Sequence, residues 1–164
     1  MENSARIPLP RLGACLLSGC LLAACSGIRP YADRHEHNLQ LHTRTESGAL
    51  LSRVHAAVDI YGVDDRCETA YQGTVNLDRP AAAIGLPVDR PSYLVFGFTR
   101  SSWLAGSRST VHYATLLTPR SGHVYDIEAS YLDAIYRVRI LESASHSGGR
   151  REVGQRRLSD CVTR

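Results

Sequence analysis

The sequence predicts an all-β domain in which two sheets pack face to face. From about Leu39 onward, apolar and polar residues alternate with a period of two, as side chains do along a half-buried strand. Breaks rich in Gly, Pro, Asp and Ser separate stretches of strand length. These two observations predict a single β-sandwich, immunoglobulin-like or transthyretin-like, with about seven to eight strands.

Each expected strand combines this alternation with β-branched or aromatic residues, which fit the pleated surface of a sheet. One stretch also fits a helix, because the apolar residues of 50–61 form a stripe at helical spacing behind Ser47 as a candidate N-cap. The run Val58-Asp59-Ile60-Tyr61 is typical of a strand, so a strand is expected at least from Ala56. In chain order, the expected strands cover about residues 39–43, 54–60, 69–77, 93–98, 110–117, 123–131, 135–142 and 151–158.

Two of these strands are expected to form a hairpin. Residues 125–128 and 136–140 would be its arms, with the turn near Leu132 and Asp133. Acidic residues on the first arm and arginines on the second would pair across it. Exposed pairs of this kind contribute only tenths of a kcal/mol, but they help to fix the register.

The N-terminal 24 residues have the pattern of an export signal. Arg6 and Arg11 make a basic start, and an apolar stretch of 13 residues, 12–24, follows. A membrane-spanning helix needs roughly 20 apolar residues, so this stretch is too short to remain as an anchor. The small residues at its end are typical of a peptidase site.

The step Leu22-Ala23-Ala24-Cys25 resembles the lipobox of bacterial lipoproteins. The resemblance implies cleavage before Cys25 and acylation of that cysteine, so that palmitate and other acyl chains anchor the protein in a bilayer. Ser26 in place of Asp implies the outer membrane, with the domain facing the periplasm. Leu17-Ser18-Gly19-Cys20 also fits the pattern, and Cys20 is the rival lipidation site.

The expected organisation is a signal peptide at 1–24, a flexible tether at 25–37 and a β-sandwich domain at 38–164. The tether segment is polar and contains Pro30. The mature chain of 140 residues has the length of one domain. It carries 17 basic residues, all arginine, against 15 acidic ones, and this small net charge does not favour nucleic acid as a partner.

The cysteine count predicts one disulfide. Cys15 and Cys20 leave with the signal and Cys25 carries lipid, so Cys67 and Cys161 remain as an even pair in an oxidising compartment. The closed loop would span 94 residues, for which loop entropy sets a ceiling of roughly 4 to 5 kcal/mol.

Short motifs also resemble a loose class of small uncharacterised proteobacterial β-sandwich lipoproteins. They are the run 58–61 followed by Cys67, the segments 84–87 and 119–125, and a cysteine near the C-terminus, at Cys161. The resemblance covers about residues 56–161 and implies fold and placement. It implies no catalytic residue and no activity.

Two clusters are candidates for binding. His35 and His37 alternate in an extended segment and would point the same way, as two ligands of one metal ion do. A flexible tether would not hold a preformed site, which makes them weak metal candidates. Trp103 and Leu104 lie in an expected loop, where they would form a contact site for a partner or the membrane.

The sequence indicates a non-enzymatic protein without a cofactor. It contains no Gly-x-Ser-x-Gly elbow and no Gly-rich phosphate loop. We expect a membrane-anchored periplasmic accessory lipoprotein, an interaction or structural module of the envelope whose partners are the lipid bilayer and an envelope protein. The alternative is a metal- or small-ligand-binding lipoprotein that uses the His35 and His37 segment.

Overall fold

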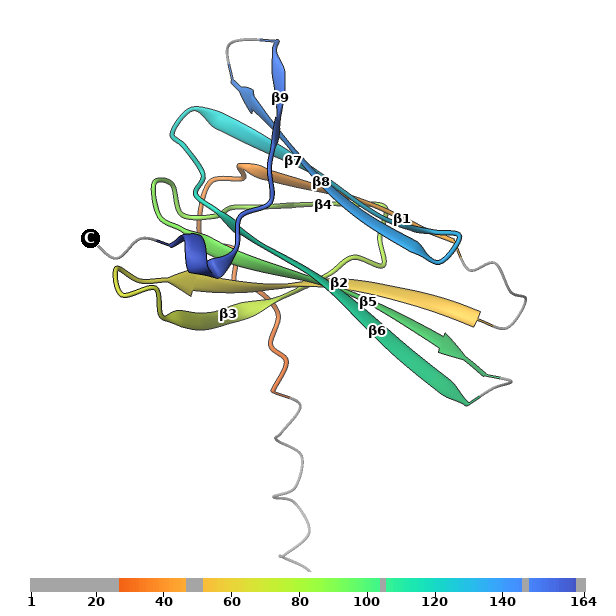
Figure 1. Ribbon diagram of the computed structural model, residues 1–164. Coiled ribbons are helices and arrows are strands. Elements are labelled where there is room, and N and C mark those ends of the chain that lie inside the picture. Colours follow the sequence, from red (N-terminus) through yellow and green to blue (C-terminus); the bar gives the residue numbers. More distant parts are fainter. Residues whose placement is uncertain (1–26, 47–51, 104–105, 146–147, 162–164) are drawn as a thin grey trace, which may run out of the picture.

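The computed structural model describes residues 27–46, 52–103, 106–145 and 148–161 of the 164-residue chain. These residues form two stacked β-sheets (Figure 1). The strands are β1 (Leu39–Thr45), β2 (Ser52–Val63), β3 (Thr69–Asn76), β4 (Ala81–Ile84), β5 (Ser92–Ser102), β6 (Ser107–Leu117), β7 (His123–Leu132), β8 (Ile135–Ala144) and β9 (Arg150–Val153), followed by a 3₁₀ turn, η1 (Leu158–Asp160).

The five-stranded sheet has the order β4-β1-β7-β8-β9, and the four-stranded sheet has the order β3-β2-β5-β6. Within the sheets β1 and β7 run parallel, and every other described neighbour pair is antiparallel. The two layers lie one above the other in Figure 1. Among the described residues, no helix is long and apolar enough to cross a membrane.

The core lies between the sheets and is built from alternate residues of their strands. In β5, Leu94, Phe96 and Phe98 are buried while the residues between them are half-buried. Tyr125 and Ile127 of β7 are buried in the same cluster from the opposite sheet. Burial of side chains of this size stabilises the fold by about 1.5–3 kcal/mol each, so the shared core holds the two layers together.

The predicted fold class is confirmed. β2 is a strand from Ser52, so the helical interpretation of 50–61 is wrong for the described residues 52–61. The hairpin of β7 and β8 turns at Asp133 and Ala134, both with positive φ, and pairs Glu128 with Arg139 at 3.4 Å. The described residues form nine strands instead of the expected seven to eight, and β4 is the strand that was not predicted. The last strand ends at Val153 instead of reaching 158.

The segment 29–38, which we call the N-terminal strap, differs from the expected flexible tether. Arg29 and Tyr31 pair with the backbone of Thr74 at the edge of β3, at 2.8 and 3.0 Å. Further along, the buried Asn38 side chain exchanges two hydrogen bonds of 2.9 Å with the backbone of Leu86. The strap passes so close to Gly85 that a side chain there would meet the backbone of His35, and it is therefore part of the domain.

The segment 154–161, which we call the C-terminal crossover, links the two sheets on the opposite side. After β9 it leaves the five-stranded sheet, and Leu116 of β6 donates a backbone hydrogen bond of 2.8 Å to Arg156. The buried Thr115 hydroxyl accepts a second bond, from the Arg156 amide, at 3.1 Å. The crossover ends at Cys161, which is disulfide-bonded to Cys67 with the two Cα atoms 5.8 Å apart, as predicted.

Candidate functional site

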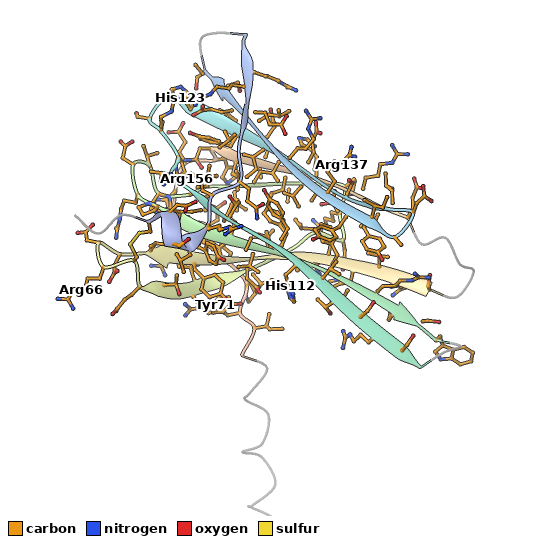
Figure 2. The ribbon with its side chains drawn as sticks, viewed as in Figure 1. Arg66, Tyr71, His112, His123, Arg137 and Arg156 are labelled. Carbon is orange, nitrogen blue, oxygen red and sulfur yellow. A yellow bond between two sulfur atoms is a disulfide. The ribbon has the colours of Figure 1, made fainter. Side chains whose placement is uncertain are left out.

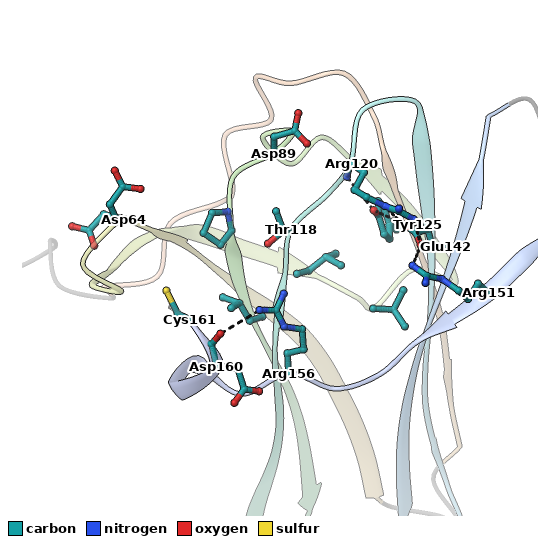
Figure 3. Close-up of a pocket in the computed structure, with 15 residues that line it drawn as sticks. Asp64, Asp89, Thr118, Arg120, Tyr125, Glu142, Arg151, Arg156, Asp160 and Cys161 are labelled. Carbon is teal, nitrogen blue, oxygen red and sulfur yellow. Dashed lines mark hydrogen bonds and ion pairs between the residues drawn. The ribbon is translucent and has the colours of Figure 1, made fainter. Parts of the chain in front are cut away.

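A hollow of about 620 Å³ opens between the two sheets beside the C-terminal crossover. Leu116, Leu117 and Val153 line its apolar part. Figure 3 shows Arg120, Glu142 and Arg151 together on one side, Asp64 on the other side and Arg156 between them. The lining residues come from both sheets and from the crossover that links β9 to β6.

Glu142 of β8 is the centre of the polar side of the hollow. Its Oε1 accepts hydrogen bonds from the Arg120 Nε at 2.8 Å and the Tyr125 hydroxyl at 2.7 Å. Its Oε2 accepts from the Nη2 atoms of Arg120 at 2.7 Å and Arg151 at 2.6 Å. A carboxylate offers about four acceptor positions, so the described residues already fill them.

Burial and hydrogen bonding act in opposite directions on this carboxyl. Its side chain is only 4% exposed, and burial alone would raise the pKa of Glu142. The donors from Arg120, Tyr125 and Arg151 outweigh this and lower the pKa of Glu142 to about 2. Burial, together with the hydrogen bond to Glu142, raises the pKa of Tyr125. Glu142 is therefore a fixed negative charge, poorly suited to act as a general base or acid near neutral pH.

The outer face of the four-stranded sheet is a second site of interest. Tyr61, Tyr71 and Tyr93 form a cluster there. The ring centroid of Tyr61 lies 5.4 Å from that of Tyr71 and 6.4 Å from that of Tyr93. The guanidinium carbon of Arg29 lies 5.6 Å from the centroid of the Tyr71 ring, an arrangement that favours a cation–π contact. In Figure 2, Tyr71 and His112 lie on this lower side, whereas Arg137 lies on the opposite side of the molecule.

The β5–β6 hairpin extends this face toward a basic tip. Trp103, at the tip, is 83% exposed. In the strand register, Arg53 of β2 and Arg108 of β6 lie on either side of Ser101 of β5. All three are on the outer face, opposite to the core residues of these strands. The sequence has no acidic residue between Asp89 and Asp126, so this hairpin is positively charged.

The predicted metal ligands do not form a metal centre in the described residues. His37 lies 2.7 Å from Asp33, and both His35 and His37 are exposed. No group of three His, Cys, Asp or Glu side chains within the ranges that the structure describes is placed to hold a metal ion. Among the described residues, Asp33 alone accompanies His37, and no third ligand completes a metal site.

The other predicted site residues have different outcomes. Cys67 and Cys161 are joined as expected, and Trp103 is in an exposed turn. Cys25, its rival Cys20, and Leu104 lie outside the described residues.

Sequence reasoning missed the group around Glu142. One indication was present, because Glu142 follows Ile140 at the spacing of a single strand face, which places a carboxylate in a core position. A buried acid requires partners, and Arg120 and Arg151 are brought to it only by the tertiary fold.

Comparison with protein-family models, curated proteins and solved structures finds no match to this chain.

Proposed function

We propose that the protein is an accessory lipoprotein of the bacterial envelope, anchored by acylated Cys25 to the outer membrane with its domain in the periplasm. Its β-sandwich acts as a non-enzymatic interaction module held at the membrane surface. The observation that carries this proposal is the attachment of the N-terminal strap to β3 from Arg29 onward. Arg29 follows Cys25 by four residues, which span at most about 14 Å when fully extended.

So short a connection would keep the edge of β3 close to the lipid. Ile28, which precedes the strap, is 70% exposed and would contact the bilayer interface. The tyrosine cluster and Trp103 have the amphipathic rings that prefer the boundary between acyl chains and headgroups. Arginines on the same face, Arg53 and Arg108, would be attracted to anionic headgroups. These features support an orientation with the outer face of the four-stranded sheet toward the membrane.

The outer face of the five-stranded sheet would then face the periplasm. It carries ion pairs among the described residues: Arg139 lies 3.4 Å from both Glu128 and Glu152, and Arg150 lies 3.5 Å from Asp126. Charged surfaces of this kind favour specific and rapid recognition of a complementary protein surface. A periplasmic protein partner is therefore the expected second contact of this module.

Lipid attachment is tested by labelling growing cells with radioactive palmitate. The wild-type protein and a Cys20→Ala variant should take up label and fractionate with the outer membrane. A Cys25→Ala variant should remain unlabelled and unprocessed. Label that persists in Cys25→Ala and disappears only when Cys20 is changed would place the anchor nine residues before Arg29, and the short connection would be wrong.

The alternative function, metal binding through His35 and His37, has a separate test. Calorimetric titration of the folded domain with zinc, copper and nickel would reveal micromolar binding that a His35→Ala/His37→Ala double variant loses. Titrations without heat would exclude this alternative.

A further inference from the structure

We propose that the hollow beside the C-terminal crossover binds the oxyanion head of a small molecule, a phosphate or carboxylate group, between Arg120, Arg151 and Arg156. This site goes beyond the membrane-anchoring role and does not depend on lipid attachment. Three observations carry it: the donors left over by Glu142, the fixed position of the arginines and the uneven charge of the walls.

Arg120 and Arg151 have more N–H donors than the Glu142 carboxylate accepts. A guanidinium group has five N–H donors, and Glu142 accepts two from Arg120 and one from Arg151. The Arg120 side chain is 52% exposed and that of Arg151 is 72% exposed, although both line the hollow. Both guanidinium groups therefore retain N–H groups for a second anion.

Glu142 also holds these groups in place before any ligand arrives. Arg120 is gripped by two parallel hydrogen bonds, and its backbone amide donates to the Tyr125 hydroxyl at 3.0 Å. Arg151 is directly opposite Glu142 in the β8–β9 register. Two arginines share one carboxylate, so the group keeps a net charge of about +1. Because these donors are already fixed, less side-chain entropy is lost when a ligand binds.

Arg156 adds a third cation on the crossover. Its guanidinium makes one described contact, a 3.3 Å hydrogen bond to the Asp160 backbone carbonyl, so its charge is not neutralised by a carboxylate in the described residues. Asp64, Asp65 and Asp89 line other parts of the hollow, and Asp160 lines it beside Arg156, with its carboxylate bonded to the Arg157 amide at 2.7 Å. Their charge would repel a second anionic group on the ligand, so the site favours a molecule with one compact anionic end.

Calorimetric titration of the folded domain tests this proposal with three probes: inorganic phosphate, glycerol 3-phosphate and propionate. Each titration is matched with sodium chloride of equal ionic strength. The phosphates and propionate distinguish a phosphate site from a carboxylate site, and saturable binding of either class supports the proposal. The absence of saturable heat for all three probes up to about 10 mM would overturn it.

Variants on β9 locate the site. Arg151→Gln should weaken binding by about tenfold or more, because a charge-assisted hydrogen bond is lost. Arg150→Gln is the matched control, since Arg150 is the next residue and contacts Asp126 instead of Glu142; its affinity should stay within about twofold. Equal losses in the two variants would show a general charge effect and refute the site.

Circular dichroism of each variant confirms that it folds. If Arg151→Gln does not fold, Arg151→Lys replaces it, because lysine keeps the charge but lacks the planar fork of donors. Arg151→Lys should weaken binding by about threefold or more relative to wild type. Unchanged affinity in a folded Arg151→Lys variant would contradict a role for the Arg151 fork.

Discussion

Arg120 grips the carboxylate of Glu142 with two parallel hydrogen bonds of 2.8 and 2.7 Å, and so fastens the loop before β7 to the inner face of β8. The carboxylate is buried, yet it keeps its charge because the hydrogen bonds from Arg120, Tyr125 and Arg151 outweigh the effect of burial on its pKa. This pair connects the stability of the sandwich to the charge of the hollow, and its consequences for acid stability follow directly.

Glu142 should contribute to stability only while it is ionised. Its pKa in the folded protein, about 2, lies below the ordinary value of 4.5. The stabilisation is therefore fully present above about pH 4.5 and is lost as the pH falls toward 2. Glu142→Gln should lower the free energy of unfolding by about 3 kcal/mol at pH 7 and by much less at pH 2, measured by urea denaturation across this range.

Glu128→Gln is the control for the acid titration. Glu128 is exposed and its described charge partner is Arg139, so the substitution should change the free energy of unfolding by no more than about 0.5 kcal/mol at pH 7. If Glu142→Gln and the wild-type protein lose stability in parallel between pH 5 and pH 2, the network does not control acid unfolding.

The Cys67–Cys161 disulfide should hold the C-terminal crossover against β6. A Cys67→Ser/Cys161→Ser double variant should lose about 2–5 kcal/mol of unfolding free energy, because its unfolded chain is no longer closed into a loop of 94 residues. Faster hydrogen exchange is expected at the amides of Leu116 and Arg156, which bond across the crossover.

Non-reducing mass spectrometry of the wild-type protein supplies the reference for this experiment. It should show the peptides of Cys67 and Cys161 linked to each other. Free thiols at both positions, or an unchanged exchange rate at Leu116 in the double variant, would contradict the role assigned to the disulfide.

The sequence predicts the long strands because their alternation is itself the cause of the fold. β5, with Leu94, Phe96 and Phe98 on one face, can bury that face only as a strand against a second apolar layer. β4 gives no such indication, since three of its four residues are alanine and its strand conformation depends on pairing with β1. The long strands can therefore be predicted from their own residues, whereas β4 forms a strand because β1 pairs with it.

The strap and the hollow depend on contacts that composition does not reveal. The segment around Pro30 is polar and looks like a tether, yet it is held by backbone hydrogen bonds to Thr74, which do not depend on the type of side chain. The position of Glu142 on a core face is readable from its spacing, but its partners come from the loop before β7 and from β9. Neither Glu142 nor its partners was therefore predicted from the sequence, because the partners are brought together only by the tertiary fold.

Asn38 should be the side chain that contributes most to holding the strap. Its buried amide satisfies both the N–H and the C=O of Leu86, and Asn38→Ala would leave both unpaired. We expect a loss of about 2–4 kcal/mol in urea denaturation. Gln40→Ala, two residues further on, should cost less than about 1 kcal/mol, because the Gln40 side chain makes no hydrogen bond with described residues. Equal costs would show that the strap is not held at Leu86.

Trp103 should lie at the bilayer interface when the acylated protein is in a membrane. It is the only tryptophan of the chain, so its fluorescence reports on the β5–β6 tip alone. In vesicles of zwitterionic and anionic phospholipids, its emission should shift to the blue and be quenched by lipids brominated on their acyl chains.

The opposite face provides the control for this measurement. A Trp103→Phe/Arg137→Trp variant moves the tryptophan to the outer face of the five-stranded sheet, where quenching should be absent. The quenching of Trp103 in anionic vesicles should also weaken as salt is added. The reason is that Arg53 and Arg108 attract anionic headgroups only over about one Debye length, roughly 10 Å at 0.1 M. Equal quenching at the two positions, or none at Trp103, would show that the four-stranded sheet does not face the membrane.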